Sequence, residues 1–347
     1  MTTRSALTVS LLIFAPFCFA QPSSGPLYQP GDVRAGKGVP EPLDPPAASG
    51  EKWRVTASVE LHHFEQGSGT PILVVHGGPG FPPTRPWRAG ERLAADYRLI
   101  YYHQRGCGLS SRPIQSFPGH DLPAKIRQIH ETLGLPAEVA DIERIRRILG
   151  IEKLILLGHS FGADIAVLYA AEFPEHVRSL ILVAPADMAV FPQKHAGLFD
   201  LVRQRLPESM LPEYGRYLGE YFNLPRAFER TDEESSAFYA RFGKYYGAAV
   251  GGTPPVSSDA ASAGFVPLAV FCSMGQHHDY SAAYQGVQAP ALVVHGGDDL
   301  QPEQVSRDYA AYFKNGRFVR VEKAGHFVFD DRPEEFAAAV RLFLGGM

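Results

Sequence analysis

The chain has 347 residues, of which 45% are hydrophobic and 20% are charged. A chain of this size and composition can bury a large core, as one large domain or as one domain with an insertion. The formal net charge of −4 comes from 37 acidic and 33 basic residues. This balance argues against a basic binding face, so we expect no nucleic-acid partner.

The first twenty residues have the pattern of a signal peptide. Arg4 supplies a positive charge, and an apolar run covers residues 7–19. This run is shorter than the roughly 20 residues that a membrane-spanning helix needs, and Cys18-Phe19-Ala20 fits a signal-peptidase site. We therefore expect residues 1–20 to be removed. The mature protein would be periplasmic or secreted, without a stable membrane span.

The remaining chain divides into four segments. Residues 21–52 are rich in proline, which blocks helices and central strands, and are predicted to be a wrapping arm or a linker. Strand and helix patterns alternate along residues 53–185 and return in residues 289–347, as the two parts of one core. Residues 186–288 interrupt the pattern with clustered aromatic residues. They are predicted to form a helical cap over the carboxyl edge of the sheet, where open α/β sheets bind ligands.

The expected elements of the core follow from apolar runs for strands and from helical spacing for helices. In chain order they are a β-hairpin from residue 53 to 61, strands at 71–75 and 97–102, a helix at 137–149, a strand at 154–157, a helix from 161 through 169, strands at 177–183, 291–294 and 317–321, and a closing helix at 333–344. Strands that alternate with helices of this length are typical of an α/β fold with a mostly parallel, doubly wound sheet.

The most informative motif is Gly158-His159-Ser160-Phe161-Gly162, which lies between a buried strand and a helix. In this context the Gly-x-Ser-x-Gly pattern predicts a tight turn that exposes a nucleophilic hydroxyl, here that of Ser160. The turn is expected to strain the backbone of Ser160 and to leave no space for a Cβ at Gly158 or Gly162. His159 is expected to make local contacts within the turn.

A serine hydroxyl requires a base, and the base requires an orienting acid. The chain order Ser, Asp, His is the order expected for this arrangement. His326 follows the last predicted strand and is the preferred base. Asp299 follows the strand at 291–294 and is the preferred acid, with Asp298 and Asp187 as alternatives.

Other histidines fit the role of base less well, because they lie in polar or cap segments and are expected to be solvated. These histidines are His62, His63, His277 and His278. After cleavage of the signal peptide only Cys107 and Cys272 remain, and we interpret both as small buried apolar residues rather than a disulfide or a zinc site.

Acyl transfer also needs N–H donors for the oxyanion that develops on the substrate. One donor is the N–H of Phe161. The second is expected in the turn His76-Gly77-Gly78-Pro79-Gly80, where Gly78 is preferred and Gly77 is the alternative. A phosphate-binding loop is the other interpretation of this turn, but no Lys-Ser or Lys-Thr follows Gly80.

Three motifs together resemble the α/β-hydrolase superfamily, and most closely its prolyl aminopeptidase (proline iminopeptidase) branch. They are the turn at residues 76–80, Gln104-Arg105-Gly106-Cys107-Gly108-Leu109-Ser110, and the motif at residues 158–162. The resemblance covers about residues 59–344. It implies an α/β-hydrolase fold, a serine hydrolase without metal or cofactor, Ser160, Asp299 and His326 as the catalytic triad, and a helical cap that shapes the pocket.

The chain departs from that branch at two places. His103 stands where the family usually has Asp, and Phe242-Gly243-Lys244-Tyr245-Tyr246-Gly247 has Gly where relatives that cleave N-terminal proline place a Glu for the substrate amine. Residues that could replace this Glu are Glu229, Glu233 and Glu234.

The sequence therefore predicts a serine hydrolase of an ester or amide in a small molecule or short peptide, with a prolyl aminopeptidase-like peptidase as one form. The alternatives are a carboxylesterase for small acyl esters and a catalytically silent binding protein.

Overall fold

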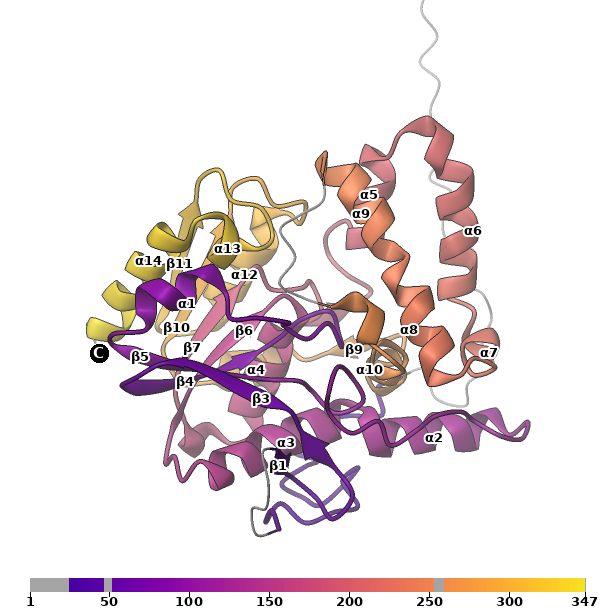
Figure 1. The fold of residues 1–347 in the computed structure, drawn as a ribbon, viewed down its shortest axis with the longest axis horizontal. Helices are drawn as coiled ribbons and strands as arrows, with labels where there is room; N and C mark the ends of the chain where they lie inside the picture. The colour runs from indigo at the N-terminus through magenta and orange to yellow at the C-terminus, as the bar shows by residue number, and fades with distance from the viewer. Residues whose placement is uncertain (1–24, 47–51, 253–258, 347) are drawn as a thin grey trace, which may run out of the picture.

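The computed structural model describes residues 25–46, 52–252 and 259–346. The predicted signal peptide lies outside these residues. Within them, the core is one seven-stranded sheet in the order β11-β10-β7-β6-β4-β5-β3 (Figure 1). The strands are β3 (His63–Gly67), β4 (Thr70–Val75), β5 (Tyr97–Tyr102), β6 (Leu154–His159), β7 (Val177–Val183), β10 (Ala291–Gly296) and β11 (Gly316–Val321).

Neighbouring strands of this sheet run parallel, except that the edge strand β3 runs antiparallel to β5. The prediction of a mostly parallel, doubly wound sheet is confirmed. The predicted hairpin after residue 52 is also present, because β1 (Trp53–Arg54) pairs antiparallel with β2 (Glu60–Leu61).

Helices cover both faces of the sheet. Successive residues of a buried strand point to opposite faces, so each central strand contributes side chains to two buried clusters. Leu156 belongs to one buried cluster and Leu157 to the other. The first cluster includes side chains of α3 (Leu135–Ile148), α4 (Phe161–Glu172) and α12 (Glu303–Tyr312). The second includes side chains of α1 (Arg88–Leu93), α13 (Val328–Asp331) and α14 (Pro333–Gly345).

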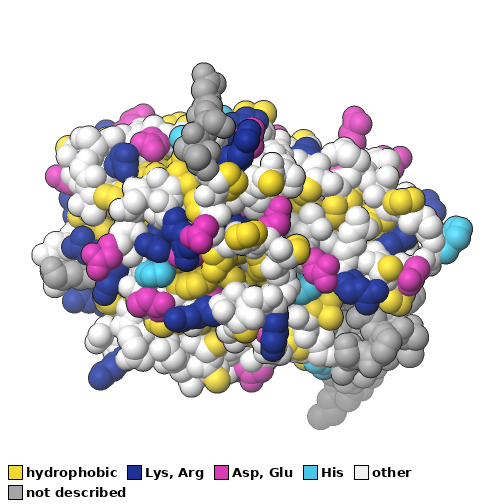
Figure 2. Space-filling model, turned by 90° about the horizontal axis from the view of Figure 1, so that it is seen from below, with side chains coloured by type: hydrophobic (Ala, Val, Ile, Leu, Met, Phe, Trp, Pro, Cys, Tyr) yellow, Lys and Arg dark blue, Asp and Glu magenta, His cyan; other side chains and the backbone are white. Residues whose placement is uncertain are grey.

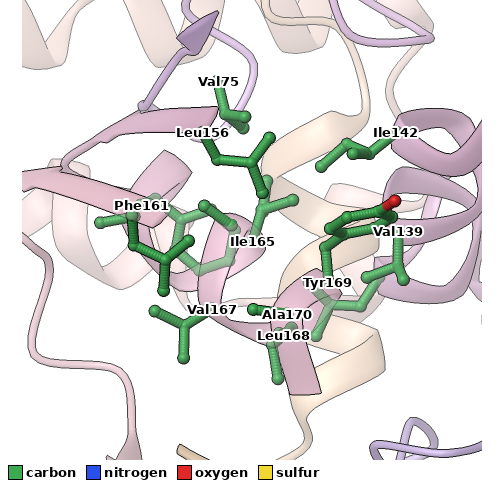
Figure 3. Close-up of a cluster of buried hydrophobic side chains, with 14 of the residues drawn as sticks. Val75, Val139, Ile142, Leu156, Phe161, Ile165, Val167, Leu168, Tyr169 and Ala170 are labelled. Carbon is green, nitrogen blue, oxygen red and sulfur yellow. The ribbon is translucent and has the colours of Figure 1, made fainter. Parts of the chain in front are cut away.

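Helix α4, which starts directly after Ser160, is the most deeply buried helix of the core. Its apolar residues pack between the sheet and α3, and Figure 3 shows Ile165 near Leu156 and Tyr169 beside Val139. The Tyr169 hydroxyl donates a 2.9 Å hydrogen bond to the Glu143 carboxylate of α3. The element that carries the predicted nucleophile is therefore fixed on several sides.

The inserted segment is mainly helical, and its helices α5 to α9 stand together beside the sheet (Figure 1). Its aromatic residues pack mainly on one another, and the same buried cluster includes Leu300 and partly buried Phe81 from loops of the core. The cap therefore packs on those loops. The elements are β8 (Val190–Phe191), α5 (Leu198–Arg205), α6 (Leu211–Tyr221), α7 (Leu224–Ala227), α8 (Asp232–Ala240), α9 (Phe242–Val250), α10 (Val266–Met274), β9 (His278–Asp279) and α11 (Ser281–Gly286).

The described part of the proline-rich segment, residues 25–46, wraps against the core. Its anchor is the buried carboxylate of Glu172, at the end of α4. This carboxylate accepts hydrogen bonds from the Tyr28 hydroxyl (3.3 Å) and from the N–H groups of Gly31 (2.5 Å) and Arg34 (2.6 Å). Tyr28 itself is fully buried, so this part of the arm is an integral layer of the protein.

Additional elements are the helix α2 (Leu122–Leu133) and the short 3₁₀ helices Pro174–His176, Glu208–Met210 and Ala260–Ser262. No helix in the described ranges combines the length and hydropathy that a membrane crossing requires. On the face that Figure 2 shows, basic and acidic side chains are interspersed, without a large area of one charge.

Candidate active site

Ser160 occupies the sharp turn between β6 and α4. Its backbone has φ 52° and ψ −125°, a conformation that costs a non-glycine residue about 1–3 kcal/mol. The Ser160 N–H donates a 2.9 Å hydrogen bond to the Val183 carbonyl of β7, which holds the turn in place. The hydroxyl is thus lifted from the carboxyl end of the sheet.

The glycines on either side of Ser160 are required by close backbone contacts. A Cβ on Gly158 would lie 2.5 Å from the carbonyl oxygen of Gly162. A Cβ on Gly162 would overlap the carbonyl oxygen of Val75, at the end of the neighbouring strand β4. Both contacts are tighter than ordinary packing allows, so any side chain at these positions would displace the turn.

Asp299 and His326 meet at the same edge of the sheet. The Asp299 Oδ2 and the His326 Nδ1 are 2.9 Å apart, and the Asp299 Oδ1 accepts a 3.0 Å hydrogen bond from the Gln301 N–H. The Asp299 side chain is fully buried, and that of His326 is 10% exposed. The carboxylate keeps the proton on Nδ1, which leaves the His326 Nε2 free to accept a proton from a hydroxyl.

The loops that carry Asp299 and His326 are bound to each other. A Cβ on Gly296 would overlap the carbonyl oxygen of Gly325, and the Asp298 N–H donates a 2.8 Å hydrogen bond to the Ala324 carbonyl. The Asp298 side chain points to solvent. Of the three acids considered from the sequence, the structure brings Asp299 to His326.

The third acid is engaged elsewhere. The Asp187 Oδ2 accepts a 3.3 Å hydrogen bond from the His195 N–H. Burial is the main reason why the pKa of Asp187 is raised above its usual value. The structure thus gives Asp187 no contact with His326.

The Ser160 hydroxyl makes no hydrogen bond within the described part of the chain. The structure therefore joins Asp299 to His326 directly, but it does not join His326 to Ser160 by a hydrogen bond. Catalytic hydrogen bonds are often long or misaligned without substrate and tighten when substrate binds. The neighbouring rings of His159 and His326 have centroids 4.8 Å apart, so the turn that carries Ser160 and the loop that carries His326 are adjacent.

His159 links the turn at Ser160 to the loop that carries His326. Its Nε2 lies 3.1 Å from the His326 carbonyl oxygen. Burial lowers the pKa of His159 well below its usual value, and the proximity of His326 lowers it further. A neutral His159 therefore donates its Nε2–H to that carbonyl. The expectation of local contacts for His159 did not include this hydrogen bond, which spans 167 residues of sequence.

The turn after β4 lies directly against Ser160. A Cβ on Gly77 would lie 2.8 Å from the Cβ of Ser160. In the described residues, the N–H groups of Gly78 and Phe161 have no acceptor, so both are available to a bound oxyanion. The Gly77 N–H likewise has no acceptor there, so Gly77 remains the alternative donor.

These observations can be set beside known proteins. A family model described as the alpha/beta hydrolase fold matches residues 70–333. This chain belongs to the α/β-hydrolase family. The family predicted from the three sequence motifs is therefore confirmed.

Among curated relatives of this α/β hydrolase is a proline iminopeptidase from Heyndrickxia coagulans, 26% identical over 296 residues, which are 82% of this chain and 93% of that protein. Another is a putative non-heme bromoperoxidase, BpoC, from Mycobacterium tuberculosis, 27% identical over 83% of this chain and 99% of that protein. Relatives with different names at equal distance do not decide an activity.

Solved structures show the same fold at lower identity. The bromoperoxidase from Bacillus anthracis has a TM-score of 0.60 at 19% identity and covers 83% of this chain and 96% of its own. A thermophilic esterase from Thermogutta terrifontis has a TM-score of 0.52 at 21% identity, covering 83% and 94%. Both support the α/β-hydrolase fold of the chain.

One departure of this α/β hydrolase from the proline iminopeptidase pattern, at His103, has a structural explanation. His103, in place of the usual Asp, is buried, and burial is the main cause that lowers its pKa to about 4. Its Nδ1 accepts a 3.0 Å hydrogen bond from the Leu109 N–H, and its Nε2 lies 3.1 Å from the Pro83 carbonyl. A neutral imidazole thus ties two loops together at the position of the missing carboxylate.

The sequence-based expectation about His278 was wrong, and the one about the two cysteines was confirmed. His278 was expected to be solvated, but it is buried with its ring nitrogens 3.1 Å from the Met274 carbonyl and 3.0 Å from the Met188 carbonyl. Cys107 and Cys272 are buried free thiols, as predicted. In the described ranges, no three His, Cys, Asp or Glu side chains are grouped so that they could hold a metal ion.

The sequence patterns also gave no indication of Asp331, which supports the loop that carries His326. Its carboxylate accepts a 2.8 Å hydrogen bond from the Gly325 N–H, next to His326. Burial is the main cause that raises the pKa of Asp331 above its usual value. No local pattern marks this role, because it depends on how α13 packs under the loop.

Proposed function

We propose that this α/β hydrolase is a serine hydrolase that forms an acyl-enzyme on Ser160. The observation that carries the proposal is the hydrogen bond between Asp299 and His326, at the sheet edge where the strained turn presents the Ser160 hydroxyl. An imidazole held in this tautomer by a buried carboxylate is the arrangement that activates a serine.

The reaction follows from these positions. His326 Nε2 takes the proton of the Ser160 hydroxyl as its oxygen attacks the substrate carbonyl carbon. The N–H groups of Gly78 and Phe161 donate to the oxyanion, each with a contribution of about 2.7–4 kcal/mol to transition-state stabilisation. The imidazolium then protonates the leaving alcohol or amine. Water, deprotonated by the same imidazole, releases the acid from Ser160.

We further propose that the preferred substrates are carboxylic esters with a small, partly apolar acyl group. An N-terminal amine would need a carboxylate that faces the site from the cap. Most described cap carboxylates are already held by other groups, namely Asp187, Glu213, Glu220, Glu229, Asp232, Glu234, Asp259 and Asp279.

The remaining cap acids fit the amine-binding role no better. Glu208 and Glu233 are exposed, and Asp200 lies in the first turn of α5, where the helix N-terminus itself stabilises a negative charge. A cationic amine without such a partner would lose a charge-assisted contact of about 1.5–3 kcal/mol. The cap therefore favours a neutral substrate.

Prolyl aminopeptidase activity is the second candidate, and the similarity to proteins named proline iminopeptidase supports it. The test compares kcat/KM for p-nitrophenyl acetate and butyrate with kcat/KM for proline p-nitroanilide. We expect ester turnover that disappears in Ser160→Ala, with little turnover of the prolyl amide. Higher kcat/KM for the prolyl amide would overturn the ester assignment and would make Asp200 the first carboxylate to replace.

A catalytically silent binding protein is the remaining alternative. Ester and amide turnover both absent from the folded protein, with no reaction of Ser160 with a fluorophosphonate, would support that alternative.

We also propose that the protein is exported and that its mature chain begins at Gln21. N-terminal sequencing of the protein from the periplasm or medium of its host tests this, and an intact residue 1 would contradict it.

A further inference from the structure

The first residue of the turn after β4, His76, has a different backbone partner for each ring nitrogen. Its Nδ1 lies 3.0 Å from the Gly77 carbonyl oxygen, and its Nε2 lies 3.1 Å from the backbone N of Gln104. The side chain of Gln104 donates a further 3.0 Å hydrogen bond to the His76 carbonyl. His76 is only 2% exposed, so solvent does not compete for these contacts.

These partners determine the tautomer of the imidazole. The Gln104 backbone N–H can only donate, so the His76 Nε2 must accept and the proton must be on Nδ1. The Nδ1–H then donates to the Gly77 carbonyl. Burial is the main cause that lowers the pKa of His76 to about 3, so the ring stays neutral near neutral pH.

The Gly77 carbonyl is held from two directions, because the Phe81 N–H also donates to it at 3.1 Å. The peptide bond between Gly77 and Gly78 is trans, so the Gly78 N–H points away from that carbonyl. The position of Gly77 against the Cβ of Ser160 places this peptide beside the nucleophile. Fixing the carbonyl therefore fixes the direction of the Gly78 N–H.

Because residues 77 and 78 are both glycine, the peptide between them needs a hydrogen bond to hold its orientation. Gly78 has φ +119°, a conformation that other residues rarely adopt. A Cβ at this position would lie 2.6 Å from the Phe81 backbone N. The loop therefore needs glycine, and glycine leaves the peptide free to rotate unless a neighbouring group holds it.

We propose that His76 is a positioning residue for catalysis, because its Nδ1–H holds the Gly77 carbonyl and so directs the Gly78 N–H at the substrate oxyanion. This inference rests on the proposed function, since it assumes an acyl-transfer reaction at Ser160. It assigns to His76 a role in the transition state, beyond its contribution to packing.

Two substitutions separate the two ring contacts. In His76→Asn the amide nitrogen stands near the position of Nδ1 and can donate to the Gly77 carbonyl, while the Gln104 N–H loses its acceptor. In His76→Gln the amide oxygen stands near the position of Nε2 and can accept from the Gln104 N–H, while the contact with Gly77 is lost.

The proposal predicts that activity and stability change in opposite order in these variants. We expect kcat for a p-nitrophenyl ester to fall about tenfold or more in His76→Gln, below the 10²–10³-fold that loss of a whole oxyanion donor causes. KM should change less than about twofold, because the lost interaction belongs to the transition state. His76→Asn should keep kcat within about threefold of the parent, although its buried N–H without an acceptor makes it the less stable variant.

A purely structural role predicts the reverse order, with the less stable variant less active. Equal kcat values in both variants, or parental kcat in His76→Gln, would overturn the proposal. A variant that does not fold does not remove the test, because the tautomer can be measured in the parent by ¹⁵N NMR of histidine-labelled protein. The proposal requires the Nδ1–H form of His76 at pH 7, and the Nε2–H form or an imidazolium would refute it.

The proposed function is tested separately. A parent protein that shows the Nδ1–H form of His76 but neither hydrolyses esters nor reacts with a fluorophosphonate would refute the serine hydrolase assignment. A parent that does hydrolyse esters, with parental kcat in His76→Gln, would refute only the role of His76.

Discussion

Replacing Asp299 by Asn tests the proposed catalytic arrangement with a change of a single group. Asp299 Oδ1 accepts the Gln301 N–H at 3.0 Å, and Oδ2 faces the His326 Nδ1 at 2.9 Å. An asparagine will keep its oxygen toward the Gln301 N–H and turn its NH₂ toward His326. The imidazole must then accept at Nδ1 and carry its proton on Nε2, where it cannot take the proton of Ser160.

The free-energy cost of recovering the active tautomer of His326 determines how far kcat falls in Asp299→Asn. It requires a flipped amide that points its NH₂ at the buried Gln301 N–H, which leaves donors unpaired at a cost of about 1–3 kcal/mol. The imidazolium that forms during reaction also loses a charge-assisted hydrogen bond of about 1.5–3 kcal/mol. At about 1.4 kcal/mol per factor of ten, kcat should fall about 10²- to 10⁴-fold.

The assay is steady-state hydrolysis of a p-nitrophenyl ester, together with the rate of fluorophosphonate labelling. Asp298→Asn is the matched control, because it removes the same charge one residue away from an exposed position. We expect the control to keep kcat within about twofold, in line with the small effect of an exposed charge. A kcat for Asp299→Asn within tenfold of the parent, or an equal loss in both variants, would refute the reasoning.

Three further predictions follow from the geometry. Gly158→Ala places a Cβ within 2.6 Å of the backbone of α4 and should lower the free energy of unfolding by about 1–3 kcal/mol, measured as a fall in Tm. The control Gly219→Ala, where a Cβ has open space, should not lower Tm. Equal Tm values for the two variants would contradict the need for glycine at residue 158. His159→Phe removes the donor to the His326 carbonyl and should lower kcat about tenfold. His159→Gln, whose amide reaches the same carbonyl, should keep most of the parental kcat. An equal loss of kcat in both variants would exclude that hydrogen bond as the cause of the loss. Burial is the main cause that raises the pKa of Asp164 from 3.8 to about 8. Between these pH values the folded state therefore binds more protons than the unfolded state. The free energy of unfolding then falls as the pH rises from about 4 to about 8. Asp164→Asn should therefore raise Tm, relative to the parent, by more at pH 8 than at pH 4, and an equal change at both would contradict the shift.

The central strands could be predicted from the sequence, because they are buried on both faces and read as continuous apolar runs. The strand expected at 97–102 is β5 with the same bounds, and the one at 177–183 is β7. The helix expected at 137–149 is α3 and starts two residues earlier, at Leu135. Its start is set by Pro136 in the first turn, a signal that spacing of apolar residues does not contain.

Other elements were not predicted, for different reasons. The edge strand β3, His63–Gly67, is mostly polar and only partly buried, so its strand conformation depends on pairing with β5. Helix α2 did carry local signals, since the Asp121 side chain caps it through the Ala124 N–H and Gly134 follows its last residue. Those signals identify helix ends in sequences where the apolar pattern is weak.

For the candidate site, the order of motifs along the chain selected the residues, but it could not show their contacts. Asp298 and Asp299 are adjacent in sequence, and the choice depends on how tightly the Gly296 backbone packs against Gly325. The role proposed for His76 depends on a tautomer that is set by the Gln104 N–H, 28 residues away. The contact of His159 is to a carbonyl 167 residues away. Such contacts follow from the assembled sheet edge, which no local pattern encodes.

The most direct test of the proposed chemistry is the site of covalent labelling. The folded parent protein is incubated with a fluorophosphonate, digested, and analysed by mass spectrometry. The proposed mechanism predicts one phosphonylated peptide, with the adduct on Ser160, and no adduct in Ser160→Ala. A folded protein that stays unlabelled, or one whose adduct persists when Ser160 is replaced, would contradict it.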